Sequence, residues 1–192
     1  MKDIGKIQRF KKNIKHRLFA KHNIIRYLNN IDKIQLLEIG CNRGDFLYAI
    51  KDDTSFNTLG IDIDKGALDY AENRLGLKVR FGTLETIHFD DESFDCIFAS
   101  HVIEHLLDPI STLQEIHRIL KTGGVFISIV PCVSHIKARM HGAKWKYFGP
   151  PGHLWYFSRQ TFALYLNKFN FQILFSSCFY HRAHLKVIAR KV

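Results

Sequence analysis

A short apolar run that ends in an acid and a glycine constrains this chain more than any other stretch. Residues 36–47 read LLEIGCNRGDFL. The pattern predicts a buried strand, a tight turn at Gly40 and a helix that begins near Gly44. Glycine in such a turn lets backbone amides approach a bound small molecule, because no Cβ obstructs them. We therefore expect a nucleotide-type site assembled around this loop.

Apolar runs and amphipathic segments alternate after the loop. This alternation is typical of an α/β fold, in which helices cover both faces of a parallel sheet. The sequence Lys-Thr-Gly-Gly at 121–124 is expected to end a helix before the fifth strand. The predicted strands span 35–39, 57–62, 78–81, 94–99 and 124–130, and the predicted helices span 44–52, 65–75 and 110–120, with a short helix near 101–107.

The last third of the chain departs from this alternation. Residues 132–158 are rich in Trp, Tyr and Phe and too long for a plain connection, so we expect a lid or substrate-binding insertion. A helix over 159–169, capped by Ser158, follows it. Strand-like runs at 171–179 and 184–190 then predict a closing hairpin.

Charge is unevenly distributed along the chain, which has a net charge of +10. Residues 34–130 hold sixteen acids, whereas residues 131–192 hold ten Lys and Arg and no acid. An acidic middle between basic ends favours a cationic ligand at the centre and an anionic partner at the ends. A solvated basic surface explains the same counts, and both interpretations stay open.

Residues 1–33 form a basic amphipathic helical segment ahead of a domain that we place at 34–192. Packing over the edge of the core is its expected role. Docking on an anionic membrane or on nucleic acid is the alternative. The four cysteines stand far apart, no secretory signal or membrane-spanning run is present, and we expect a cytoplasmic protein.

Asp62 follows Gly40 by twenty-two residues, at the end of the second predicted strand. A carboxylate there is placed to bind two ribose hydroxyls. A dinucleotide needs a G-x-G-x-x-G loop for its pyrophosphate, but the corresponding positions here are Gly40, Asn42 and Asp45. Asp45 and Glu38 also place negative charge near the loop. A cationic sulfonium suits this charge, so S-adenosylmethionine (SAM) is the predicted cofactor.

Four motifs give the chain a family resemblance: LEIGCNRG at 37–44, GIDI at 60–63, FDCIFASHVIEHL at 94–106 and LKTGG at 120–124. They resemble the class I SAM-dependent methyltransferases, in particular the group that includes ubiquinone-biosynthesis O-methyltransferases and small-molecule and sugar methyltransferases. The resemblance implies a Rossmann-like, doubly wound sheet of seven strands with the last strand antiparallel.

The resemblance also implies a set of cofactor-binding residues. Asp62 would hold the ribose and Ile63 would flank the adenine. Thr83 stands where the family often has an acid for the adenine amino group, and its hydroxyl or the Leu84 amide would substitute. The methionine side would be lined by Glu38, Gly40, Asn42 and Gly44, and Ser100 completes the predicted set.

The sequence His-Val-Ile-Glu-His at 101–105 has three interpretations. An H-x-x-E-H helix is found in one class of zinc proteases, but here it falls within the methyltransferase motif. His101, Glu104 and His105 on one helix face could instead ligate a divalent metal. The interpretation we adopt is a structural Glu104/His105 pair with His101 lining the site, and no metal.

Methyl transfer to oxygen benefits from a general base, and His101 and His153 are the candidates. A structural role for His153 is equally open. The sequence thus predicts that a methyl group is transferred from SAM to an oxygen of a small-molecule or carrier-linked acceptor. An acceptor that carries negative charge is one form of this prediction. A nucleic-acid methyltransferase and a non-catalytic SAM-binding regulatory protein are the alternatives.

Overall fold

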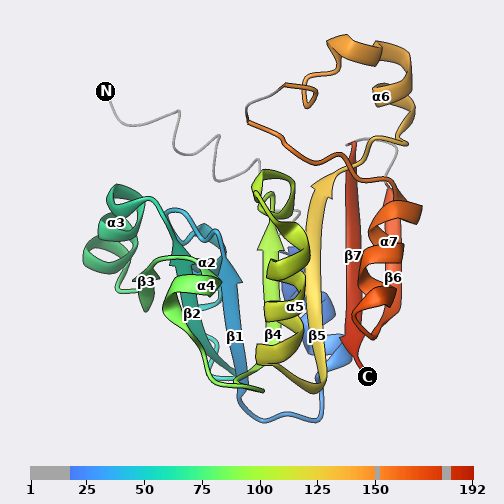
Figure 1. The fold of residues 1–192 in the computed structure, drawn as a ribbon. Coiled ribbons are helices and arrows are strands. Elements are labelled where there is room, and N and C mark those ends of the chain that lie inside the picture. Colours follow the sequence, from blue (N-terminus) through green and yellow to red (C-terminus); the bar gives the residue numbers. More distant parts are fainter. Residues whose placement is uncertain (1–17, 150–151, 179–182) are drawn as a thin grey trace.

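The computed structural model describes residues 18–149, 152–178 and 183–192 (Figure 1). Its strands are β1 (Ile34–Ile39), β2 (Phe56–Asp62), β3 (Val79–Phe81), β4 (Phe94–Ser100), β5 (Leu120–Pro131), β6 (Phe171–Cys178) and β7 (His184–Lys191). Its helices are α2 (Asp45–Ile50), α3 (Lys65–Leu75), α4 (Leu84–Ile87), α5 (Pro109–Ile119), α6 (Ile136–His141) and α7 (Arg159–Lys168), with 3₁₀ turns η1 (Ile103–His105) and η2 (Gly142–Lys144).

The strands form one seven-stranded sheet in the order β3-β2-β1-β4-β5-β7-β6. Strands β1 to β5 run parallel, and β7 is antiparallel to both β5 and β6. This confirms the predicted Rossmann-like fold with its antiparallel last strand. The chain order reverses between β1 and β4, and ligands of such sheets bind at that point, beyond the carboxyl ends of the strands.

Alternate residues of the central strands feed two hydrophobic cores, one on each face of the sheet. Leu37 of β1 and Ile97 of β4 belong to the core covered by α4, α5 and α7. Leu36 and Phe98 belong to the core covered by α2, α3 and residues 18–28. The two helical layers are visible on either side of the sheet in Figure 1. The loops at the strand ends are therefore carried by a scaffold that is buried on both faces.

Residues 18–27 form the described part of the predicted N-terminal helix. Ala20 and Ile24 are fully buried in the second core, so this part packs on the sheet. The predicted helical stripe before Leu18 lies outside the described residues. The division of the chain at residue 33 stays a prediction, as does membrane or nucleic-acid contact by the N-terminal segment.

The element bounds differ from the prediction most clearly at β5, which begins at Leu120 rather than at residue 124. The pairing with β4 skips from Phe94↔Leu120 to Cys96↔Val125, so residues 121–124 form a bulge within the strand. Gly123 has φ +81° there. The helix ends close to the expected place, at Ile119. The two glycines at 123 and 124, which were expected to end it, lie instead in the bulge of β5.

Residues 132–149 leave the sheet after β5, and residues 152–158 lead back to α7. A single bridge, Cys132↔Phe157, pairs their two ends. Figure 1 shows α6 projecting away from the sheet above the carboxyl ends of the strands. The short α4 and α6 were not predicted, because four and six residues are too few for a clear helical period.

All four cysteines lie among the described residues, and none forms a disulfide. In the described part of the chain, every helix is too short or too polar to cross a bilayer.

Candidate functional site

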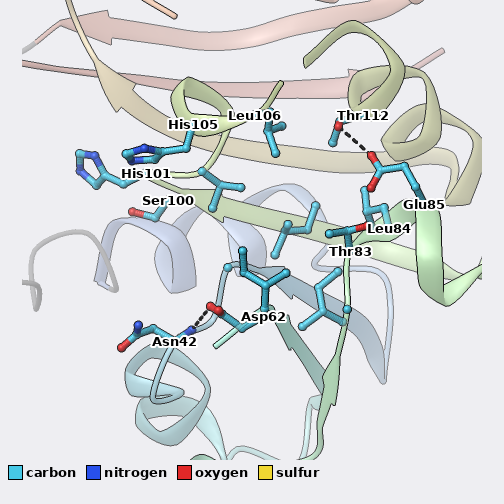
Figure 2. Close-up of a pocket in the computed structure, with 16 residues that line it drawn as sticks. Asn42, Asp62, Thr83, Leu84, Glu85, Ser100, His101, His105, Leu106 and Thr112 are labelled. Atoms are coloured by element: carbon cyan, nitrogen blue, oxygen red, sulfur yellow. Dashed lines mark hydrogen bonds between the residues drawn. The ribbon is translucent and has the colours of Figure 1, made fainter. Parts of the chain in front are cut away.

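A cavity of about 460 Å³ opens at the carboxyl ends of β1, β2 and β4 (Figure 2). Its volume falls in the range of small-molecule sites. The predicted cofactor-binding residues that line it are Gly40, Asn42, Asp62, Ile63, Thr83, Leu84 and Ser100, and the predicted base His101 lines it too. Glu38, Gly44 and His153 are not among its lining residues.

The turn after β1 is built by three residues with positive φ, Gly40 (+68°), Asn42 (+50°) and Gly44 (+72°). The amides of Gly40 and Cys41 both donate to the Ile61 carbonyl, which ties the turn to β2. A Cβ on Gly40 would lie 2.5 Å from Val102 Cγ2. Glycine is therefore required at position 40 both for its backbone conformation and for its close approach to the loop after β4.

Gly44 has a packing role that the sequence did not indicate. A Cβ there would meet Leu77 Cδ1 at 2.2 Å, so this glycine lets the start of α2 pack against the residues after α3. Glu38 is buried within β1, with 6 % of its surface exposed. Neither Glu38 nor Gly44 lines the cavity, so direct contact of either residue with SAM stays a prediction.

The carboxylate of Asp62 is held in place by the backbone. Its Oδ2 accepts a hydrogen bond from the Asn42 amide at 2.7 Å, and its Oδ1 accepts one from the Asp64 amide at 2.9 Å. Figure 2 shows Asp62 facing the turn across the floor of the cavity. Each carboxylate oxygen keeps a further lone pair, so the group is preset to accept two hydroxyl donors.

The turn lies in a region of negative potential. Burial, and then the charges of Glu38 and Asp62, raise the pKa of the Cys41 thiol. The same two carboxylates favour a cationic ligand at the cavity wall. The structure thus fits SAM in three respects, namely a cavity of suitable size, a carboxylate at Asp62 that is oriented to accept hydroxyl donors, and negative charge beside the turn.

Thr83 and Glu85 form the wall opposite the turn. The Thr83 amide and hydroxyl bond to Thr86 in a capping box at the start of α4. Glu85 accepts a hydrogen bond from the Thr112 hydroxyl at 2.9 Å (Figure 2). Burial opposes its ionisation, but hydrogen bonds from Thr83, from its own amide and from Thr112 outweigh that effect and lower the pKa of Glu85.

Glu85 therefore brings an ionised acid to the cavity two residues beyond the expected position. Glu85 was not predicted, although the run Thr-Leu-Glu at 83–85 shows an acid two residues after the position where the family often has one. His105, Leu106 and Thr112 were also not predicted as lining residues. They come from η1, from the residue that follows it and from α5, and the approach of these elements to the cavity depends on tertiary packing.

His101 follows β4 directly and has φ +59°, an uncommon conformation for a residue with a side chain. Its Nδ1 lies 3.0 Å from Oε1 of Glu104. The Glu104 side chain is fully buried, so His101 is oriented from behind by a carboxylate that water does not reach. Figure 2 shows His101 beside Ser100 and His105 at one end of the cavity.

His153 lies against His105 of η1. Its ring contacts that of His105 with centroids 4.7 Å apart, and its Nδ1 is 2.7 Å from the Tyr147 carbonyl. The amides of Leu154 and Trp155 both donate to the Glu104 carbonyl. The aromatic segment is thus fastened to the loop that carries His101.

Comparison with known proteins agrees with the geometry. A family model described as a methyltransferase domain matches residues 8–175. The chain is 30 % identical over 116 residues to the tRNA U34 carboxymethyltransferase of Nautilia profundicola, covering 58 % of this chain and 39 % of that protein. It is 27 % identical over 125 residues to the demethylmenaquinone methyltransferase of Staphylococcus epidermidis, covering 59 % and 49 %.

Solved structures agree on the fold. A SAM-dependent methyltransferase from Aquifex aeolicus matches over the whole of both chains with a TM-score of 0.69 at 20 % identity. One from Mesorhizobium loti matches with a TM-score of 0.70 at 16 % identity, covering 88 % of this chain and 95 % of that one. The chain spans two fifths to a half of the length of the two curated relatives above. The family match covers most of the chain, and this chain belongs to the methyltransferase domain family, with SAM as its cofactor.

Proposed function

We propose that this methyltransferase transfers the methyl group of SAM to an oxygen of a small-molecule or carrier-linked acceptor. The observation that supports this most is the His101–Glu104 pair at the edge of the cofactor cavity, with 3.0 Å between Nδ1 and Oε1. A histidine held by a buried carboxylate is suited to take a proton from a hydroxyl.

In this proposal the cofactor is held from two sides. Asp62 accepts the ribose hydroxyls, and Glu85 with the Leu84 amide faces the adenine. The turn at Gly40 and Asn42 faces the methionine portion, with Ser100 at its edge. When bound, SAM supplies an electrophilic methyl group on a sulfonium. The protein then has to align the acceptor oxygen in line with that group and exclude water.

His101 has the central part in the transfer. The acceptor oxygen forms a bond to the methyl carbon while the carbon–sulfur bond breaks and its electron pair stays on sulfur. The acceptor's hydroxyl proton passes to Nε2 of His101. Glu104 is a positioning residue, because it fixes the ring through Nδ1. We assign the base to His101 rather than His153, because only His101 lines the cavity.

The aromatic segment 145–157 supports an acceptor with a ring or sugar face. Trp155 donates from Nε1 to the Leu106 carbonyl at 2.8 Å, which places the segment beside a residue of the cavity wall. The cations Lys137, Arg139 and Lys144 just before this segment, and Lys146 within it, favour a phosphate or other anionic handle on the acceptor. We place the reaction in the cytoplasm.

A nucleic-acid acceptor is the second candidate. Two observations favour it, the absence of any acid from residues 131–192 and the likeness to a relative named as a tRNA U34 carboxymethyltransferase. Polyanion binding by that basic third would serve an RNA acceptor as well as a phosphorylated small molecule.

Incubation of the protein with methyl-labelled SAM and fractionated cell extract tests the proposal. We expect label in the small-molecule, lipid or glycan fraction, released by conditions that cleave methyl esters or ethers, and no label with His101→Asn. Label in RNA establishes the second candidate. SAM binding without label in any fraction overturns both and leaves a SAM-binding protein.

A further inference from the structure

Three side chains converge beside the cavity, and among them only Glu104 has a part in the proposed transfer, where it positions His101. They are Glu104 and His105 of η1 and His153 of the aromatic segment. One ligand atom from each lies within 4.8 Å of the other two, and His105 Nε2 is 4.0 Å from Glu104 Oε1. Among the residues that the structure describes, this is the group whose donor atoms converge in this way.

The two imidazoles have their Nδ1 atoms turned away from the point of convergence. Nδ1 of His105 faces the Gly152 carbonyl, and Nδ1 of His153 faces the Tyr147 carbonyl. A carbonyl only accepts hydrogen bonds, so each Nδ1 carries a proton and each neutral ring keeps its lone pair on Nε2. Metal-binding histidines are commonly oriented in this way, with the other ring nitrogen donating to a carbonyl.

The carboxylate of Glu104 adds a second, independent indication. The residue is fully buried, and its Oε2 has no hydrogen-bond partner among the described residues. A buried anion with an unsatisfied oxygen is costly unless a cation compensates it. The other oxygen, Oε1, lies 3.0 Å from His101 Nδ1 and 4.0 Å from His105 Nε2, so the carboxylate as a whole faces the histidines with one oxygen still unsatisfied.

We propose that Glu104, His105 and His153 bind a divalent transition-metal ion, with Zn²⁺ the best match. Two neutral imidazoles and one carboxylate suit Zn²⁺ and its first-row neighbours better than Mg²⁺ or Ca²⁺, which prefer oxygen ligands. Zn–N distances of about 2.0–2.1 Å require the donor atoms to close by roughly 1 Å. His153 lies on a segment outside the sheet, so a shift of that size disturbs no strand pairing.

The ion would join η1 to the aromatic segment at the wall of the cofactor cavity, since His105 lines that cavity. Three protein ligands leave at least one coordination position for water or an acceptor oxygen. The metal site shares Glu104 with the proposed His101–Glu104 pair but involves neither Asp62 nor the turn at Gly40, so Zn²⁺ binding is measured without SAM and without methyl transfer.

The test uses the full chain without a polyhistidine tag, stripped with a chelator and dialysed. Calorimetric titration with Zn²⁺, checked by elemental analysis, is expected to give one equivalent per chain, and Co²⁺ is expected to give the visible absorption of a tetrahedral site. His105→Ala and His153→Ala should each weaken Zn²⁺ binding at least about tenfold. Exposed His22, on the helix 18–27, provides the matched control His22→Ala, which should bind normally.

The proposal is overturned if the His105→Ala, His153→Ala and His22→Ala proteins bind Zn²⁺ with equal affinity. It is also overturned if the unaltered chain binds Zn²⁺ no more tightly than a variant with both His105→Ala and His153→Ala. Glu104→Gln is interpreted only if its thermal midpoint stays near that of the unaltered chain, and the two histidine variants decide the question without it. SAM affinity, measured separately, is expected to stay unchanged in His153→Ala, so failure of the metal site and failure of the methyltransferase assignment are distinguishable.

Discussion

The cofactor cavity and the aromatic segment lie side by side, but they are held by different interactions. Strand register brings the cavity residues together, since β1 pairs with β2 at Ile39↔Ile61 and with β4 at Ile39↔Ala99. The residues that follow these pairs, Gly40, Asp62 and Ser100, therefore reach the same edge of the sheet. The aromatic segment lies outside the sheet and has few backbone contacts, namely the bridge at Phe157 and the two amides that donate to the Glu104 carbonyl. Side-chain hydrogen bonds of His153 and Trp155 hold the rest of it.

This difference has a consequence for variation. A site set by strand register changes little when one surrounding side chain changes, because many backbone hydrogen bonds hold it. A site set by single side-chain contacts is altered by the loss of any one of them. We expect substitutions in the aromatic segment to affect the acceptor and to leave the cofactor unaffected.

The largest expected effect comes from His101→Asn. Asparagine tolerates the positive φ of this position, so the backbone turn should persist. Loss of a general base typically lowers turnover by about 10²–10⁴-fold. We expect that loss in label transfer to the acceptor fraction, with SAM affinity changed no more than twofold. Transfer at the normal rate would remove His101 from the mechanism.

Gly40→Ala is expected to damage the cavity side alone. Its Cβ would add a left-handed strain of about 1–2 kcal/mol and a clash with Val102 that brings the total to about 2–5 kcal/mol. Gly76→Ala is the matched control, because Gly76 has φ +66° with nothing within 4 Å of an added Cβ. Chemical denaturation should show the larger loss for Gly40→Ala. Equal losses would mean that Val102 moves aside.

Trp155→Phe tests the aromatic segment. The substitution removes the hydrogen bond from Nε1 to the Leu106 carbonyl, which should lower the free energy of unfolding by about 0.5–1.5 kcal/mol. We expect faster proteolysis within residues 145–157 and SAM affinity equal to that of the unaltered chain. A drop in SAM affinity would show that the aromatic segment also shapes the cofactor cavity.

The smallest effect concerns His117, which belongs to neither region and packs edge-on against Phe171. Burial, and then the charge of Lys191, lower the pKa of His117 in the folded protein. The unfolded chain then binds the proton at higher pH, so stability falls as the pH drops below about 6.5. Denaturation at pH 7.5 and 5.5 should show a smaller loss in His117→Phe than in the unaltered chain.

A second loss of stability is expected at lower pH, and it arises from a carboxyl group rather than from His117. Asp53, beside Lys21, has a lowered pKa, chiefly through its hydrogen bond with that lysine. A carboxyl group of this kind contributes stability above its unfolded pKa of about 3.9 and loses it as the pH falls further. His117→Phe should therefore leave the decline below pH 4 unchanged.

The sequence predicted the cavity side well because strand periodicity and glycine turns are local signals. Gly40 lies in the turn after β1 and Asp62 lies at the end of β2, as predicted. A turn between a strand and a helix, and the end of a strand, can each be recognised from a few consecutive residues. Glu85 was missed because its role depends on the capping box of α4, which presents the acid two positions later than expected.

The side that carries His153 was much less predictable. The composition of residues 132–158 indicated an insertion, but nothing in the sequence links His153 to His105, forty-eight positions earlier. That contact arises from two backbone bonds to the Glu104 carbonyl. The histidine cluster therefore depends on tertiary structure that no short window of sequence encodes.

Calorimetric titration of SAM into the unaltered chain, Asp62→Ala and His153→Ala tests the central claim, that the cofactor site is complete without the aromatic segment. Each charged hydrogen bond to a ribose hydroxyl is worth about 1.5–3 kcal/mol, so Asp62→Ala should weaken SAM binding at least about tenfold. His153→Ala should bind SAM as the unaltered chain does. Unchanged affinity in Asp62→Ala, or an equal loss in both variants, would contradict the account.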